Sequence, residues 1–115
     1  MDGRRMLVVE DDPTTCTLLQ TLFARRRWEV ATASTVADGL AKLTPPPDLL
    51  ILDLNLPDGF GTRILRRVRS DNLPTRVVVA TAHDPASLGE VARLRPDAFL
   101  QKPVDLAGML RACEV

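Results

Sequence analysis

Cysteine and histidine are scarce in this chain, and their scarcity argues against two classes of site. The 115 residues include two cysteines, Cys16 and Cys113, and one histidine, His83. The cysteines are far apart in sequence and outside any metal-ligand spacing, so neither a zinc site nor the disulfide framework of a small secreted domain is indicated. The composition favours a reduced, cytoplasmic setting.

The chain also lacks an excess of charge of either sign and lacks a long apolar run. Fifteen basic and fifteen acidic residues cancel, which argues against nucleic acid or an anionic membrane surface as the main partner. The basic cluster Arg25-Arg26-Arg27 is typical of the solvated end of an amphipathic helix. No run approaches membrane-spanning length, and the first residues lack the apolar region of a signal peptide. We therefore expect a soluble cytoplasmic protein.

Short apolar runs alternate with amphipathic segments five times along the chain, which predicts one α/β domain over residues 1–115. The expected strands are residues 5–10, 28–33, 48–53, 76–80 and 97–101. A first helix opens at Asp12-Pro13, and the others are expected at 35–43, 62–69, 84–94 and 104–113. Residues 54–61 are expected to form a loop. Right-handed crossovers that cover both faces of a parallel sheet favour the doubly wound strand order 2-1-3-4-5.

Helical periodicity also predicts which side chains face the core. In the first helix these are Leu18, Leu19, Leu22 and Phe23, and in the last helix they are Leu106 and Leu110. The third strand is apolar almost throughout, as expected for a strand with helices on both faces. It is therefore predicted to lie at the centre of the sheet.

Polar side chains follow the apolar runs at the points where the predicted strands end. They are Glu10, Asp11, Asp53, Thr81 and Lys102. Because the carboxyl ends of parallel strands meet at one edge, we expect these groups to converge there. A single acid at a strand end is usually just solvent-exposed, but three acids on adjacent strand ends are unfavourable without a cation. Ligands that are all oxygen favour Mg²⁺, with Mn²⁺ as an alternative.

Asp53 is the best candidate nucleophile among the three acids, because it ends the predicted central strand between the other acids and Lys102. Lys102 can neutralise an oxygen of a phosphoryl group, and Thr81 can donate a hydrogen bond to another. Each of these two residues alone is a weak signal, since lysine and threonine are common at strand ends. Together they predict transfer of a phosphoryl group onto the Asp53 carboxylate.

Four motifs resemble the receiver domain of two-component response regulators. They are Val8-Val9-Glu10-Asp11-Asp12, Asp53-Leu54-Asn55-Leu56-Pro57 with Gly61, Ala80-Thr81-Ala82, and Lys102-Pro103. The resemblance covers essentially the whole chain, and it implies a flavodoxin-like sheet. Because receivers are a standard example of the 2-1-3-4-5 order, the predicted strand order is not independent of this resemblance.

The resemblance implies a role for each matched residue. Asp53 is the phosphoacceptor, Asp11 and Asp53 bind Mg²⁺ together with the backbone carbonyl of Asn55, and Glu10 acts through a metal-bound water. In the run Glu10-Asp11-Asp12 we assign the metal pair to the first two residues, because Asp12 before Pro13 is a helix cap. The phosphodonor is a sensor histidine kinase or a His-containing phosphotransfer protein. Thr14, Thr15, Cys16 and Val104 are candidate contacts for that donor.

In such receivers, phosphorylation couples a hydroxyl on strand four to an aromatic residue on strand five, here Thr81 and Phe99. The coupled change alters the surface of helix four, strand five and helix five, which then meets an effector or a second copy of the domain. In a chain with three Phe, one Trp and no Tyr, Phe99 fits a core position equally well. His83 is a candidate modulator of dephosphorylation, although a lone loop histidine without a role is also consistent with the sequence.

Other functions fit the same residues less well. A phosphatase of the haloacid-dehalogenase type needs a second Asp two positions after the nucleophile, where this chain has Asn55. A flavin-binding protein needs a hydroxyl-rich first loop, where this chain has acids. A pseudo-receiver that acts only as a binding module is expected to lack part of the acidic pocket or the lysine. The expected last helix stops near Cys113, which favours a receiver domain excised from a longer regulator and acting as a phosphoacceptor, not as an enzyme.

Overall fold

A five-stranded parallel sheet forms the centre of the molecule. The computed structural model describes residues 3–83 and 88–113. The sheet has the order β2-β1-β3-β6-β7. Its strands are β1 (Arg4–Val9), β2 (Trp28–Ala33), β3 (Leu49–Leu52), β6 (Arg76–Thr81) and β7 (Ala98–Gln101). A separate antiparallel hairpin contains β4 (Asn55–Leu56) and β5 (Gly59–Phe60). Strands β6 and β7 are thus the fourth and fifth strands of the predicted sheet, and its predicted order is confirmed.

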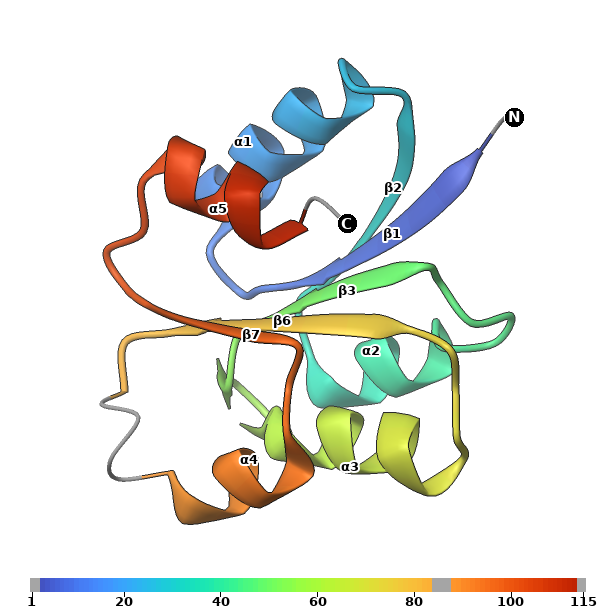
Figure 1. Cartoon of the computed structure of the whole chain (residues 1–115). Helices are drawn as coiled ribbons and strands as arrows, with labels where there is room; N and C mark the ends of the chain where they lie inside the picture. The colour runs from blue at the N-terminus through green and yellow to red at the C-terminus, as the bar shows by residue number, and fades with distance from the viewer. Residues whose placement is uncertain (1–2, 84–87, 114–115) are drawn as a thin grey trace.

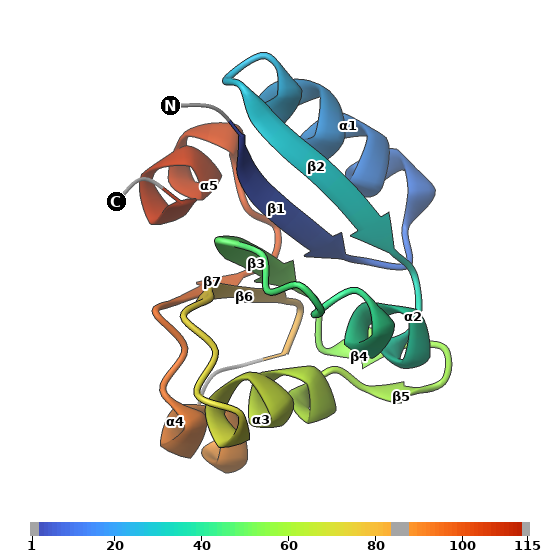
Figure 2. The ribbon, with the colours of Figure 1, turned by 90° about the vertical axis from the view of Figure 1, so that its right-hand side faces the viewer.

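Helices cover both faces of this sheet (Figure 1). They are α1 (Pro13–Ala24), α2 (Val36–Ala41), α3 (Thr62–Ser70), α4 (Gly89–Leu94) and α5 (Leu106–Cys113). Helices α1 and α5 lie on one face, and α2, α3 and α4 lie on the other (Figures 1 and 2). This is the doubly wound, flavodoxin-like α/β fold that the sequence predicts.

The central strand β3 sets the position of the carboxyl edge of the sheet. All four of its residues are at most 3% exposed, because helices cover it on both faces. Its last residue, Leu52, pairs with Val9 on one side and with Val79 on the other. The three central strands are therefore in register near their carboxyl ends. The residues that follow them meet at one edge of the sheet.

Alternate residues of each strand contribute to two hydrophobic clusters, one on each face. On β1, Leu7 and Val9 belong to the cluster under α2, α3 and α4, whereas Met6 and Val8 belong to the cluster under α1 and α5. Burial of these side chains is the main favourable contribution to folding. It holds the strands, and hence the residues at their ends, in a fixed arrangement.

Two predicted core residues lie instead on the surface. Leu18 of α1 is 49% exposed and Leu106 of α5 is 41% exposed, so the prediction that they face the core is wrong. Helix α1 buries Leu19 and Phe23, with Leu22 partly buried, and α5 buries Met109 and Cys113, with Leu110 partly buried. Leu18 and Leu106 both line a hollow between the two helices. Periodicity places them on the right side of each helix, but at the margin of the contact with the sheet.

Several element boundaries also differ from the predictions. The segment expected as a loop at 54–61 contains the β4–β5 hairpin, α2 ends at Ala41, and α5 begins at Leu106. Helix α4 begins at Gly89, and its predicted start at Asp84-Pro85 lies outside the described residues. Within residues 3–83 and 88–113, no helix has the length and apolar character needed to cross a membrane.

Candidate functional site

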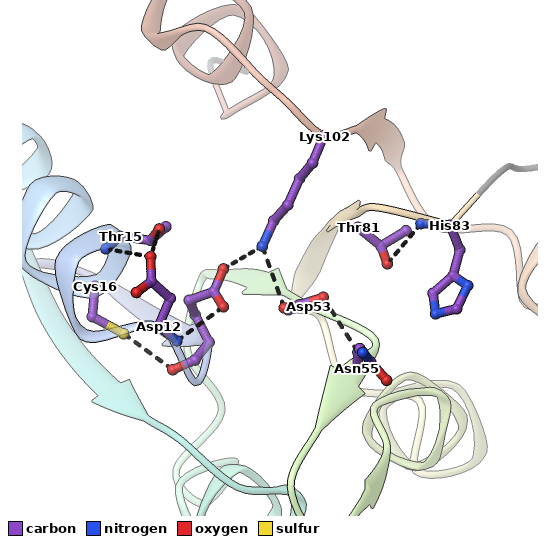
Figure 3. A network of polar contacts seen from close by, with 9 residues as sticks. Asp12, Thr15, Cys16, Asp53, Asn55, Thr81, His83 and Lys102 are labelled. Carbon is purple, nitrogen blue, oxygen red and sulfur yellow. Dashed lines mark hydrogen bonds and ion pairs between the residues drawn. The ribbon is translucent and has the colours of Figure 1, made fainter.

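The carboxyl edge of the sheet brings an amine against two buried carboxylates. Glu10 follows β1, Asp53 follows β3 and Lys102 follows β7. The Lys102 Nζ lies 2.6 Å from Glu10 Oε1 and 3.3 Å from Asp53 Oδ2 (Figure 3). Glu10 is 4% exposed and Asp53 is 7% exposed. Three residues from distant parts of the chain thus meet, as their positions at strand ends predict.

Asp11 completes an acidic cluster at this edge. Glu10, Asp11 and Asp53 each offer one carboxylate oxygen, and these oxygens all lie within 4.8 Å of one another. Lys102 supplies one positive charge to a cluster of three carboxyl groups. A further cation would therefore reduce the repulsion between these groups. The donors of the cluster are carboxylate oxygens, which suit a hard divalent cation such as Mg²⁺ better than zinc or copper. The residues present therefore fit the metal that receiver domains usually bind.

The environment shifts the pKa values of two groups in the site. Burial raises the pKa of the Glu10 carboxyl, although the hydrogen bonds from Lys102 and from the Asp12 N–H act in the opposite direction. Burial acts to lower the pKa of Lys102, but the hydrogen bond to Glu10 and the charge of Asp53 outweigh it, and the pKa lies above its ordinary value. The Lys102 amine is therefore firmly cationic at neutral pH.

Asp12 lies next to the cluster but has a different role. Its carboxylate caps α1 by accepting hydrogen bonds from the Thr15 N–H at 3.2 Å and from the Thr15 hydroxyl at 2.5 Å. The hydroxyl bond from Thr15 holds the pKa of Asp12 below its usual value. The predicted helix cap is confirmed, and the two acids before Asp12 are the ones in the cluster.

Thr81 and His83 lie beside the phosphoacceptor candidate at the end of β6 (Figure 3). Thr81 is fully buried, and its Oγ1 accepts a hydrogen bond from the His83 N–H at 3.4 Å. The His83 ring contacts Phe60 edge-on, with ring centroids 5.6 Å apart. Phe99 is partly buried and packs against the hydrophobic cluster under α2, α3 and α4.

The sequence predicts Asn55 as a site residue but not the β4–β5 hairpin that positions it. This hairpin carries Asn55, whose N–H donates to Asp53 Oδ1 at 3.2 Å, and Phe60, which contacts His83. The run Pro57-Asp58-Gly59 is a turn signature that could have revealed the hairpin. The Asp58 carboxylate accepts hydrogen bonds from the N–H groups of Val36 and Ala37, and these bonds lower its pKa.

A hollow of about 520 Å³ between α1 and α5 opens onto the site. Glu10, Asp53 and Lys102 line it together with apolar side chains of both helices. Of the candidate contacts for a phosphodonor, Thr15 and Val104 line the hollow, Thr14 is exposed and Cys16 is half-buried. The Cys16 thiol donates to the Glu10 carbonyl oxygen at 3.1 Å.

Comparison with known proteins assigns this arrangement to a family. Residues 6–114 match the model of the response regulator receiver domain. The chain is 34% identical to the transcriptional regulatory protein TrcR of Mycobacterium tuberculosis, covering 89% of this chain and 40% of TrcR. It is 32% identical to the acid tolerance regulatory protein ActR of Rhizobium meliloti, covering 95% of this chain and 57% of ActR. The chain thus spans about half the length of these relatives.

Solved structures agree with the sequence comparison. A CheY-like response regulator receiver domain protein from Methanospirillum hungatei superposes with a TM-score of 0.87 at 25% identity, covering 96% of this chain and 90% of that one. A response regulator receiver domain protein from Clostridium thermocellum gives a TM-score of 0.82 at 27% identity, covering 94% and 89%. The chain belongs to the response regulator receiver domain family, whose members are signalling domains of two-component systems.

Proposed function

We propose that this receiver domain accepts a phosphoryl group on Asp53 from a histidine of a sensor kinase or of a His-containing phosphotransfer protein. The observation that carries the proposal is the position of the Asp53 carboxylate, 3.3 Å from the Lys102 amine and within the acidic cluster. The family places such domains between an upstream kinase and a downstream effector. Cytoplasmic phosphorelay signalling is the function that this site supports best.

The transfer is a displacement at phosphorus. An Asp53 carboxylate oxygen forms a bond to phosphorus, the bond from phosphorus to the donor histidine nitrogen breaks, and that nitrogen takes up a proton from water. Lys102, already cationic, neutralises one oxygen of the transferred group, and the buried Thr81 hydroxyl donates a hydrogen bond to another. Attack of water on the acyl phosphate later releases inorganic phosphate and restores Asp53. The domain thereby assists its own phosphorylation and dephosphorylation and converts no separate substrate.

In this proposal four residues would hold the metal. Asp11, Asp53 and the backbone carbonyl of Asn55 would be its ligands, and Glu10 would act on it indirectly. Bound Mg²⁺ neutralises charge on the phosphoryl oxygens and removes the repulsion between phosphate and the acids. Mn²⁺ has the same preference for oxygen ligands and would serve in its place.

The proposed output is a shift in the population of two surfaces. Thr81 moves toward the phosphoryl group, and the space it leaves is available to Phe99, which packs against the neighbouring core. The face formed by α4, β7 and α5 then changes its preference for an effector or for a second copy of the domain. Chemical shifts of Phe99 and of the α4 amides in NMR spectra before and after phosphorylation test this coupling.

His83 modulates the lifetime of the phosphorylated state in this proposal. Its backbone N–H donates to Thr81 and its ring contacts Phe60, and both partners belong to segments that border Asp53 (Figure 3). The lifetime of the aspartyl phosphate in His83→Ala tests this role. An unchanged lifetime would show that His83 has no part in dephosphorylation.

Intact mass measured after incubation with acetyl phosphate or phosphoramidate tests the phosphoacceptor directly. We expect one phosphoryl group per wild-type chain, added only with Mg²⁺, labile to base and absent from Asp53→Asn. Asp12→Asn is the matched control, because it removes a neighbouring carboxylate while Asn retains the capacity to cap α1. No addition to a folded wild type under any condition would make the domain a pseudo-receiver, a binding module that acts without phosphorylation.

A further inference from the structure

The Asp58 side chain links the β4–β5 hairpin to α2 by hydrogen bonds, beside the core packing that Leu56 and Val36 share. Its Oδ1 accepts from the Val36 N–H at 2.7 Å and its Oδ2 accepts from the Ala37 N–H at 3.0 Å. These donors are more than 20 residues away in sequence. Figure 2 shows the hairpin beside the start of α2. The contact therefore joins two segments that are distant in sequence.

The first turn of α2 is capped by two residues at once. The Oγ1 of Thr35, the residue before the helix, accepts a hydrogen bond from the Asp38 N–H at 3.0 Å. Asp58 accepts hydrogen bonds from the N–H groups of Val36 and Ala37, the two residues that precede Asp38. A negative charge at a helix N-terminus is favourable, which agrees with the lowered pKa of Asp58. Asp58 is therefore an ionised, doubly hydrogen-bonded anchor for the hairpin.

Helix α2 packs on β1, the strand that ends just before Glu10 and Asp11. A Cβ added at Gly39 would lie 2.7 Å from Ile64 Cδ1 and 3.2 Å from Val9 Cγ2, so the helix backbone packs directly on β1 and α3. The strand before α2 is also linked to the cluster, because the Glu10 N–H donates to the Ala33 carbonyl at 2.9 Å. Glu10, Asp11 and α2 thus belong to one closely packed unit.

The β4–β5 hairpin contains Asn55, another residue of the proposed metal site. Asn55 pairs with Phe60 and Leu56 with Gly59, and the Gly61 N–H donates to the Leu54 carbonyl at 2.8 Å. Only three positions separate Asp58 from Asn55, and the two lie on one paired loop. A shift of Asp58 away from α2 therefore shifts Asn55 relative to Asp11 and Glu10.

We propose that Asp58 is a positioning residue for the metal site. By capping α2 it sets the spacing between the hairpin that carries Asn55 and the β1 end that carries Glu10 and Asp11. This inference rests on the proposed function, in which the Asn55 carbonyl and the acids hold one Mg²⁺. Asp58 touches neither the metal nor the phosphoryl group and acts through the backbone of the hairpin.

Titration of the folded protein with MgCl₂ by isothermal calorimetry tests the inference. Groups that orient metal ligands typically contribute 10- to 100-fold to metal affinity, so we expect Asp58→Ala to bind Mg²⁺ about 10-fold more weakly than the wild type. Asp58→Asn keeps one of the two oxygen acceptors, and we expect its affinity to lie between those of the wild type and Asp58→Ala. Asp38→Ala, which removes a carboxylate from α2 without touching the hairpin, is the matched control.

The outcomes separate position from charge and from folding. Wild-type affinity in folded Asp58→Ala overturns the inference, and so does an affinity in Asp58→Asn as weak as in Asp58→Ala, because charge alone would then explain the loss. If Asp58→Ala does not fold, the Mg²⁺ affinity of Asp58→Ser is measured instead, because the shorter serine side chain holds the hairpin less firmly. Wild-type Mg²⁺ affinity in Asp58→Ser then overturns the inference. A wild type that binds no Mg²⁺ overturns the proposed metal site as well, which the Asp58 variants alone cannot do.

Discussion

Gly61, just after the β4–β5 hairpin, packs against the backbone that follows β3, and Gly61→Ala tests how tightly the two segments pack. A Cβ at this position would overlap the Asp53 carbonyl oxygen and would lie 3.1 Å from the Leu54 Cα and 3.2 Å from the Leu52 Cδ1. The backbone of Gly61 has φ −62° and ψ −13°, which alanine adopts without strain. In the folded state the cost of the substitution is therefore steric.

The size of the change in stability depends on which atoms the new Cβ would contact. Overpacking a core typically costs about 1–3 kcal/mol, and less where a flexible side chain can move aside. Here the nearest atoms are backbone, so we expect the upper end, about 3 kcal/mol. That corresponds to a change of about 100-fold or more in the ratio of folded to unfolded protein. Because the overlapped oxygen belongs to Asp53, we also expect slower phosphorylation by acetyl phosphate.

Urea unfolding of Gly61→Ala, of the wild type and of Gly89→Ala measures the effect. Gly89 begins α4, and a Cβ there would meet no atom within 4 Å. Alanine is a better helix former than glycine, so Gly89→Ala is expected to be neutral or to stabilise by up to about 1 kcal/mol. A free energy of unfolding for Gly61→Ala within about 0.5 kcal/mol of the wild type would refute the close packing of Gly61 on Asp53.

Three further predictions concern the core, the metal and pH. Leu65→Ala, at a fully buried position, should lower the free energy of unfolding in urea by about 2–5 kcal/mol, whereas Leu18→Ala should change it by no more than about 0.5 kcal/mol. Asp11→Asn should stabilise the metal-free protein by removing one of three clustered acidic groups. At a Mg²⁺ concentration ten times the dissociation constant, binding should raise the free energy of unfolding of the wild type by roughly 1.4 kcal/mol, and Asp11→Asn should lose most of this gain. An equal gain in both proteins would contradict the prediction. The pKa of Asp58 is lowered from 3.8, so its carboxylate stabilises the fold above that pH and the contribution is lost as the pH falls through the lowered pKa. The difference in Tm between the wild type and Asp58→Asn should accordingly be largest near neutral pH and shrink in acid, and a difference that persists at low pH would rule out the charge as its cause.

The sequence was sufficient to predict the sheet and the residues that meet at its edge. Strands such as β3 are continuous apolar runs, and a run of that kind between amphipathic segments has few stable arrangements other than a covered parallel sheet. Once the strands are parallel and in register, the residues that follow them must share an edge. The meeting of Glu10, Asp53 and Lys102 follows from this geometry without knowledge of any individual contact.

Tertiary structure decided which side of a periodic pattern is actually buried. Leu18 and Leu19 both fit the apolar face of α1, yet Leu19 is 4% exposed and Leu18 is 49% exposed. Periodicity identifies a face only to within about one residue position on the helix. The rotation of α1 against the sheet, and the place of α5 beside it, are properties of the packed molecule.

Tertiary structure alone decided the details of the loop that carries Asn55. Strands of two residues, such as β4 and β5, are too short to show a periodic pattern. The hydrogen bonds from Val36 and Ala37 to Asp58 join residues more than 20 positions apart, and local sequence does not specify such a pair. Local patterns determined the strands and which residues meet at the edge of the sheet, because both depend on burial and strand direction. The spacing between the hairpin that carries Asn55 and the end of β1 depends on long-range contacts, which exist only once the chain has folded.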